Sequence, residues 1–270
     1  MNKAILFDRI PGLKRVHLFE EIESTNDFGK KLLTDGPVEL PALIYTSKQT
    51  RGRGRGGKTW ISGQGSLTFS FMVDSSPKLS LAHESLLWGI AVAESLNALA
   101  TPTEPLFSVK WPNDVMANEK KVAGILIESI VQSKQARVVG IGINLSNSTA
   151  SYRDSPATPG STTSAISVEE ISGGKLDAVE VLASIWSQWN RLRKLPTNLI
   201  QAALTRCDFL RERQIQLESG NLSVSGSYQG IDSRAAIRIK IGSQLKSFQS
   251  GSITGFGPRQ DQSPTVRSPG

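Results

Sequence analysis

Apolar and polar residues alternate along the chain with two different periods. Leu67, Phe69 and Phe71 are separated by Thr68 and Ser70, and an apolar residue at every second position is typical of a β-strand. Other segments are short, continuous apolar runs, which are also consistent with strands. Together these two patterns predict strands over residues 14–22, 43–46, 67–73, 107–110, 122–131 and 138–145.

Other segments have helical spacing. Residues 81–100 and 176–195 carry apolar residues three and four positions apart, which predicts two amphipathic helices. Ser24-Thr25-Asn26 can cap a third helix over residues 26–34, and Asp35-Gly36-Pro37 ends it.

After Cys207 the pattern changes to short strands separated by turns. Ile237, Ile239 and Ile241 alternate with polar residues, and Gly220-Asn221 is typical of a turn. This pattern predicts a small antiparallel β-domain. We expect a first domain over residues 1–205 with a surface loop over 146–174, the β-domain over 206–257, and a disordered tail over 258–270.

Composition narrows the function classes. The chain has 270 residues with 31 Lys and Arg against 24 Asp and Glu, a net charge of +7 that favours anionic partners. One cysteine excludes an internal disulfide, and with two histidines it argues against a His/Cys zinc site. No segment approaches the ~20 apolar residues of a membrane span, and the N-terminus lacks the apolar core of a signal peptide. We therefore expect a cytoplasmic protein that does not bind membranes.

Residues 49–60, QTRGRGRGGKTW, are the most informative segment. Glycines let the backbone turn and approach a ligand closely, and arginine side chains present a fork of donors that matches phosphate oxygens. The segment therefore predicts an anion-binding loop. A solvated basic loop without a ligand is the plainer alternative.

The same loop also matches two nucleotide-binding patterns. Gly52 with Gly57-Lys58-Thr59 has P-loop spacing, and Gly52, Gly54 and Gly57 match GxGxxG. Both patterns need a helix directly after the glycines, whereas residues 60–65 are expected to form a loop that leads into a strand. A P-loop NTPase is therefore a minor alternative. So is an RGG-type nucleic-acid-binding segment, because such segments are usually repeated and disordered.

A second polar group follows the strand at 107–110. Pro112 cannot continue a sheet ladder, so Asn113 and Asp114 are expected at a strand end, although a plain turn explains the same residues. Gly124 lies within the next apolar run, and residues 140–144 read GIGIN. Glycine inside a strand indicates close approach by a ligand or a neighbouring backbone, although a strand leaving into a loop fits 140–144 equally well.

Taken in order, these segments resemble the biotin–protein ligases. The motifs that carry the resemblance are Ser24-Thr25-Asn26, QTRGRGRGGKTW at 49–60, KWPND at 110–114, KKVAGIL at 120–126 and GIGIN at 140–144. The resemblance implies an α/β (α+β) fold, a mixed sheet flanked by helices as in class II aminoacyl-tRNA synthetases. It also implies a small SH3-like β-barrel at the C-terminus.

The resemblance also implies an activity. Members of this family join biotin to ATP, which gives biotinyl-5′-AMP and pyrophosphate with Mg²⁺ as the metal of the nucleotide. They then pass biotin to one lysine of a biotin carboxyl carrier protein, usually a subunit of acetyl-CoA carboxylase. The family contains monomers and homodimers. Lipoate or octanoate ligases share the fold and remain the nearest alternative.

The resemblance assigns roles to residues that match the motifs. Catalytic roles fall to Arg55, Lys121, Asp114 and Lys110, and we expect Asp114 to help the acceptor lysine lose its proton, with Mg²⁺ near it and no tight metal site. The residues implied for biotin are Ser24, Thr25, Asn26, Gln49, Gly52, Arg53, Arg55, Lys121 and Gly124. Those implied for ATP or the adenylate are Arg53, Arg55, Lys58, Trp60, Asn113, Lys121 and Asn144.

The sequence departs from the family pattern in two places. The catalytic motifs begin near residue 15, so we expect no N-terminal winged helix and no binding to DNA. Lys58 stands where many members have a further arginine, which keeps the charge but loses the bidentate fork.

Overall fold

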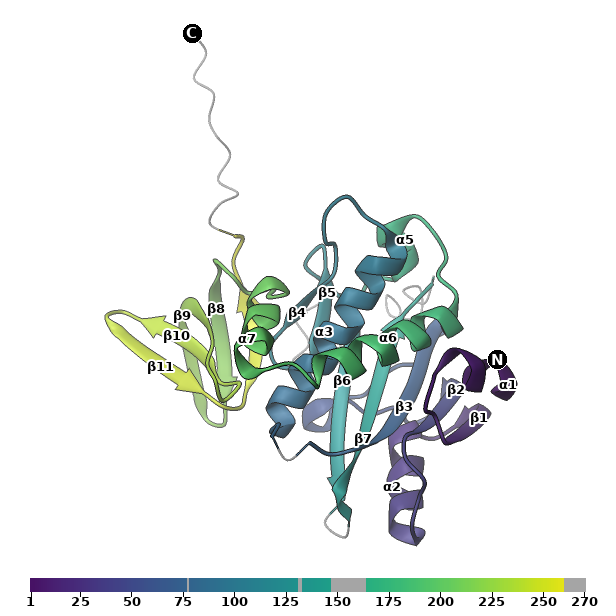
Figure 1. The fold of residues 1–270 in the computed structure, drawn as a ribbon. Coiled ribbons are helices and arrows are strands. Elements are labelled where there is room, and N and C mark those ends of the chain that lie inside the picture. Colours follow the sequence, from purple (N-terminus) through teal and green to yellow (C-terminus); the bar gives the residue numbers. More distant parts are fainter. Residues whose placement is uncertain (77, 131–132, 147–163, 260–270) are drawn as a thin grey trace.

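The structure is a computed structural model that describes residues 1–76, 78–130, 133–146 and 164–259. It consists of a large mixed sheet with helices on both faces and a smaller antiparallel sheet beside it (Figure 1). This arrangement confirms the expected α/β class. Within the described residues, no helix is both long enough and apolar enough to span a membrane.

The large sheet has seven strands in the order β1-β2-β3-β7-β6-β5-β4. β1 and β2 are parallel and all other neighbours are antiparallel. The sequence pattern missed β5, because it is short and follows a segment that also fits a turn. The strands are β1 (Arg15–Ile22), β2 (Ala42–Gln49), β3 (Ser66–Asp74), β4 (Ser108–Lys110), β5 (Asp114–Ala117), β6 (Lys120–Ile130) and β7 (Ser133–Asn144).

One face of this sheet packs on α3 (Leu81–Ala100) and α6 (Ala178–Leu192). The indole rings of Trp88 and Trp189 stack 4.2 Å apart where the two helices meet. α2 (Thr25–Asp35) lies against β3, β6 and β7, where a second, smaller apolar cluster forms.

Three further helices were not predicted from the sequence. α1 (Lys3–Arg9) packs on α6, and α7 (Thr197–Arg206) leads into the small sheet. α5 (Val168–Ser172) lies inside the segment expected to be a loop, where Ser167 and Glu170 form a capping box that starts the helix. The rest of that predicted loop, residues 147–163, is outside the described residues.

The C-terminal strands form a five-stranded antiparallel sheet in the order β11-β10-β9-β8-β12. Its core residues, such as Ile237 and Ile239, belong to the same apolar cluster as the core of the large sheet. An antiparallel β-segment was expected here, although β11 and β12 were not. Most of the predicted tail, residues 260–270, is outside the described residues. The strands are β8 (Gln214–Ser219), β9 (Leu222–Ile231), β10 (Ile237–Ile241), β11 (Gln244–Phe248) and β12 (Ser252–Phe256).

The two sheets are joined at β4. The backbone N–H of Val109 donates to the carbonyl of Cys207 at 2.7 Å, and the N–H of Phe209 donates to the carbonyl of Val109 at 3.0 Å. The buried indole of Trp111 donates to the carbonyl of Ala235 at 3.1 Å. Residues 207–209 therefore act as an outer neighbour of β4.

Candidate active site

Three of the predicted motifs, KWPND, KKVAGIL and GIGIN, meet in a single row across the large sheet. Strand pairing places Thr68 opposite Gly142, Gly142 opposite Gly124, Gly124 opposite Asp114, and Asp114 opposite Lys110. Directly paired residues point to the same face of a sheet. The register therefore brings segments that lie far apart in the sequence to one face, the face that α2 partly covers.

The middle of this row consists of glycines, which have no side chains above the sheet. A Cβ placed on Gly142 would lie 2.2 Å from Cε2 of Trp60, and one on Gly124 would lie 3.5 Å from the same indole. Trp60 therefore rests on bare backbone, which no larger residue at Gly142 would allow. Near Gly124 lie the side chains of Lys121 and Trp60, so the predicted approach of a ligand or a backbone to Gly124 stays a prediction. Gly142, which the sequence analysis did not assign to the site, is the glycine that Trp60 covers most closely.

Beside the glycines lies a group of three charged residues, Lys110, Asp114 and Lys121, which we call the floor cluster. The Nζ of Lys121 is 2.5 Å from a carboxylate oxygen of Asp114. Lys110 is buried, and its burial lowers the pKa of the ammonium although Asp114 opposes the shift. Burial alone would raise the pKa of Asp114, but Lys121, Lys110 and Lys58 together hold that pKa below its ordinary value. Asp114 is therefore a fixed anion among cations.

The Gly-Arg loop closes on itself above this floor. The N–H of Trp60 donates to the carbonyl of Gly52 at 2.9 Å, and the N–H of Gly54 donates to the carbonyl of Lys58 at 2.6 Å. Between them, Arg55–Gly57 form one turn of 3₁₀ helix, with Gly56 and Gly57 at positive φ. The chain then runs into β3. No α-helix follows the glycines, so the P-loop alternative is wrong.

Arg55 projects from this turn. Burial lowers the pKa of its guanidinium, and the negative charge of Asp114 opposes that shift. The charge of Asp114 therefore interacts with Arg55 as well as with Lys110 and Lys121. The loop and the floor cluster are electrostatically coupled, as expected if all of these residues serve one anionic ligand.

Arg53 has different neighbours. Its guanidinium makes two hydrogen bonds with the Asp27 carboxylate, at 2.7 and 3.1 Å, and a third with Glu128 at 2.7 Å. We call Arg53, Asp27 and Glu128 the loop cluster. Burial alone would raise the pKa of Glu128, but hydrogen bonds from Lys30, Asn26 and Arg53 hold it below its ordinary value.

The sequence analysis named neither Asp27 nor Glu128. Glu128 lies two residue pairs along β6 from Gly124, on the same face. A charged residue within an apolar strand was the signal that could have identified it.

The start of α2 supplies a compact polar group. Ser24 caps the helix by accepting from the N–H of Asp27, so the capping interpretation of this residue is confirmed. The N–H and the hydroxyl of Thr25 both donate to Oε1 of Gln49, at 2.8 and 3.1 Å. The amide of Asn26 donates to the carbonyl of Leu126 and to Glu128. The side chains predicted to hold biotin are thus brought together and hydrogen-bonded.

Two asparagines line the neighbouring strands. The amide of Asn113 donates to the carbonyl of Ile125 at 2.9 Å, which ties the KWPND segment to β6. The amide of Asn144 donates to the carbonyl of Lys121 at 3.3 Å. Its Oδ1 is buried and accepts no hydrogen bond from the described residues, although buried acceptors are normally satisfied.

Comparisons with known proteins agree with the family resemblance that the sequence motifs showed. Residues 18–144 match the model of the biotin/lipoate A/B protein ligase family. A biotin–[acetyl-CoA-carboxylase] ligase of Paracoccus denitrificans is 31% identical over 228 residues, which cover 81% of this chain and 91% of that protein. The chain belongs to the biotin protein ligase family.

Two further relatives agree. A bifunctional ligase/repressor BirA of Escherichia coli is 26% identical, over 86% of this chain and 71% of that protein. The structure of a biotin protein ligase from Aquifex aeolicus in complex with biotin and ATP superposes with a TM-score of 0.73. It is 27% identical, over 90% of this chain and 99% of that one. The mixed sheet with flanking helices is therefore the family's catalytic fold.

The site contains no ready-made metal centre among the described residues. Nowhere in them do three His, Cys, Asp or Glu side chains come together as metal ligands. In the floor cluster Asp114 is the single carboxylate, and Lys121 pairs with it.

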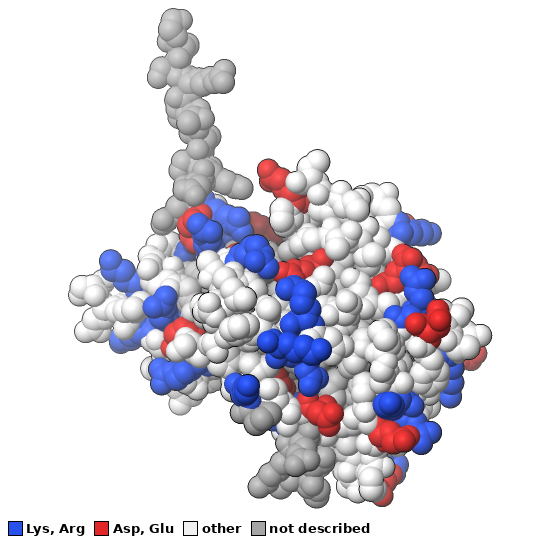
Figure 2. Space-filling view, viewed as in Figure 1, with Lys and Arg blue, Asp and Glu red and all other residues white. Residues whose placement is uncertain are grey.

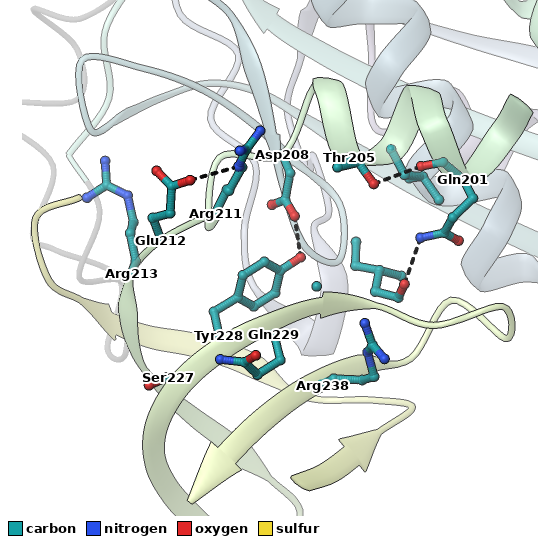
Figure 3. Close-up of a pocket in the computed structure, with 13 residues that line it drawn as sticks. Gln201, Thr205, Asp208, Arg211, Glu212, Arg213, Ser227, Tyr228, Gln229 and Arg238 are labelled. Carbon is teal, nitrogen blue, oxygen red and sulfur yellow. Dashed lines mark hydrogen bonds and ion pairs between the residues drawn. The ribbon is translucent and has the colours of Figure 1, made fainter. Parts of the chain in front are cut away.

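A separate pocket of about 440 Å³ lies between α7, the segment that follows it, and strands β9 and β10 (Figure 3). None of the predicted site residues lines it. The hydroxyl of Tyr228 donates to Asp208 at 2.5 Å on its wall. Burial of Asp208 raises its pKa to about 6.

Proposed function

We propose that this chain is an ATP-dependent biotin–protein ligase. It joins biotin to ATP to form biotinyl-5′-AMP and pyrophosphate, and then transfers the biotinyl group to a lysine of a biotin carboxyl carrier protein with release of AMP. The family match covers both biotin and lipoate ligases. The preference for biotin rests on the Paracoccus relative, whose name specifies biotin, and on the Aquifex structure with biotin and ATP.

The floor cluster is the observation that carries the proposal. In the first step a carboxylate oxygen of biotin bonds to the α-phosphorus of ATP while the bond from that phosphorus to pyrophosphate breaks. Two anions must approach, so fixed cations are needed to offset their repulsion and the growing charge. Lys121, Lys110 and Arg55 supply such cations beside Asp114, which keeps the site from excess positive charge.

The remaining residues suit the two substrates. Thr25 and Gln49, hydrogen-bonded to each other at the start of α2, offer a polar wall for the ureido ring of biotin. On the nucleotide side, Trp60 offers an aromatic face, and the unsatisfied Oδ1 of Asn144 can accept from an amino group such as that of adenine. Arg53 would have to leave its carboxylate partners to reach a phosphate.

Asp114 suits the second step better as an anion than as a strong base. Its lowered pKa weakens it as a proton acceptor. A permanent carboxylate can still draw in the acceptor lysine, whose pKa is ordinarily ~10.4. The lysine then releases its proton to solvent, and the neutral amine bonds to the carbonyl carbon of biotin while the bond from that carbon to AMP breaks. Mg²⁺ would enter with ATP, and the Asp114 carboxylate and Asn113 amide are the oxygen donors at hand.

The acceptor is proposed to be a carrier protein with an acidic surface. A band of Lys and Arg side chains crosses the middle of one face of the molecule, with Asp and Glu interspersed beside it (Figure 2). Together with the net charge of +7 this favours an acidic partner. We propose a cytoplasmic enzyme that acts as a monomer or homodimer and binds neither DNA nor membranes.

The test is release of pyrophosphate from ATP and Mg²⁺ with biotin, with lipoate and octanoate in parallel. We expect release with biotin alone, followed by biotin incorporation into an added carrier domain. Release with lipoate or octanoate but not with biotin would assign the related ligase activity instead. ATP turnover with phosphate release and no dependence on any acid would contradict both.

A further inference from the structure

An aromatic residue of the C-terminal sheet lies over a lysine of the floor cluster. Phe256 is the last residue of β12, and the Nζ of Lys110 lies 5.5 Å from the centroid of its ring. At this distance the negative face of the ring attracts the ammonium. A residue outside the predicted catalytic domain therefore contacts the site.

Phe256 is held firmly in this position. Its ring packs edge-on against Phe209 at 5.0 Å. The guanidinium of Arg213, a buried residue, lies 4.5 Å from the Phe209 ring centroid and 5.3 Å from that of Phe256. Arg213 also donates to the carbonyl of Gly257 at 2.6 Å and to Glu119, in the turn between β5 and β6, at 2.7 Å. The end of β12 is thus anchored to the large sheet.

The other end of this aromatic pair is anchored to the strand of Lys110 itself. Phe209 hydrogen-bonds through its backbone to Val109, the residue before Lys110. The Phe256 ring and the Lys110 side chain are therefore positioned by one hydrogen-bonded frame. That frame fixes their separation more tightly than packing between two independent domains would.

We propose that Phe256 is a positioning residue that covers the Lys110 ammonium and directs it toward the bound nucleotide. The C-terminal sheet thereby completes the wall of the site. The charged groups that act on Lys110 are Asp114, Lys121 and Lys58, all of them in the large domain. Phe256 adds an apolar face that keeps water from the ammonium. The direction toward nucleotide rests on the proposed function, whereas the covering of Lys110 does not.

The first experiment tests the covering without any catalysis. Lysines are acetylated with acetic anhydride, and the rate at Lys110 is measured by mass spectrometry against exposed Lys120 as the internal reference. Phe256→Leu should accelerate acetylation of Lys110 on the order of tenfold, since the ring no longer shields the amine. Phe248→Leu, in β11 of the same sheet, is the matched control and should change nothing. Equal rates at Lys110 in wild type and Phe256→Leu would overturn the proposal.

The second experiment tests the positioning by a double-mutant cycle. Phe256→Leu should raise the KM for ATP on the order of tenfold, leave the KM for biotin unchanged, and be rescued by Phe256→Tyr. In a Lys110→Met background the same substitution should have no further effect. Additive losses would show that Phe256 acts only on overall stability and would overturn the positioning role. A wild-type protein that releases no pyrophosphate would refute the proposed function, and the acetylation rates would then decide this inference.

Discussion

Two charged clusters belong to the same site, and they are built differently. In the floor cluster, Lys121 and Asp114 come from adjacent strands, with side chains 28% and 17% exposed. In the loop cluster, Arg53 and Asp27 are 40% and 46% exposed, whereas Glu128, the other partner of Arg53, is 19% exposed. Breaking a buried pair leaves an uncompensated charge and is costly, whereas exposed pairs contribute only about 0–1 kcal/mol. The floor is therefore a fixed part of the fold, and the loop contact is one that a ligand can replace.

We expect the largest loss of activity from a substitution that disrupts the floor cluster. Lys121→Gln removes a cation from the reacting phosphate and strips Asp114 of its partner. The loss of transition-state stabilisation should be about 3–4 kcal/mol, a fall of several hundredfold in kcat/KM for pyrophosphate release. Lys120→Gln is the matched control because Lys120 is exposed one residue away, and it should retain activity. Similar losses in the two variants would contradict a specific role for Lys121.

Asp208, a partly buried carboxyl, differs from Asp114 in its partners. Asp208 is hydrogen-bonded to a phenol rather than ion-paired, and its pKa is about 6 where that of Asp114 is lowered. Between the unfolded value of 3.8 and about 6, the folded state binds one more proton than the unfolded chain. The free energy of unfolding therefore decreases as pH rises through this range. At 1.36 kcal/mol per pKa unit, the change is at most about 3 kcal/mol.

Asp208→Asn should abolish this part of the pH dependence. Urea unfolding at several pH values between 4 and 7 measures it as the difference between wild type and variant, which cancels the contribution of other carboxylates. Tyr228→Phe should widen the window, because the phenol hydrogen bond lowers the pKa of Asp208. Parallel stability profiles for wild type and Asp208→Asn would show that Asp208 titrates normally.

Asp114→Asn separates the two chemical steps. If the Asp114 carboxylate draws in the acceptor lysine, the variant should slow transfer from preformed biotinyl-5′-AMP by at least about tenfold. Pyrophosphate release should change by only about threefold, since Lys121, Lys110 and Arg55 remain charged. Single-turnover assays of each half-reaction measure the two rates. Equal losses in both would contradict a role in transfer.

The smallest effect concerns the loop cluster. Glu128→Gln removes a partner of both Arg53 and Lys30 and should raise the KM for biotin only about fivefold, because the exposed carboxylate of Asp27 still pairs with both cations. Salt should reproduce this effect in the wild type, because exposed pairs are screened. The loss in Lys121→Gln, by contrast, should persist at high salt. Asp35→Asn, which removes an exposed pair with Lys31 at the far end of α2, is the control. If the effect of Glu128→Gln does not depend on salt, Glu128 behaves like the residues of the floor cluster, which contradicts this prediction.

Much of the framework could be predicted from local pattern. Strand alternation predicted most of the large sheet, and polar residues at 24–26 predicted the capped start of α2. The glycine at 124 within an apolar run indicated close approach, whereas the GIGIN pattern at 140–144 fitted a plain strand end equally well. Each of these signals lies within a few residues of the feature it reports, because side-chain period and capping are local properties.

The sequence could not show the contacts between residues that lie far apart in the chain, because these contacts depend on how the strands pair. The row of Thr68, Gly142, Gly124, Asp114 and Lys110 exists only because four strand registers align. Arg53 meets Glu128 across 75 positions. No local pattern encodes which carboxylate an arginine reaches, so the resemblance placed Arg53 near phosphates without revealing the partners it would have to leave.

The pairing of residues 207–209 with β4 also has a consequence for how the chain is made. During translation β4 is made long before Cys207. Until then the backbone N–H and carbonyl of Val109 lack the partners that Cys207 and Phe209 provide. Early domains otherwise begin to fold as they emerge. Here the outer edge of the sheet closes only after residues 207–209 have been made. A chain terminated before Cys207 would therefore lack both the outer neighbour of β4 and Phe256.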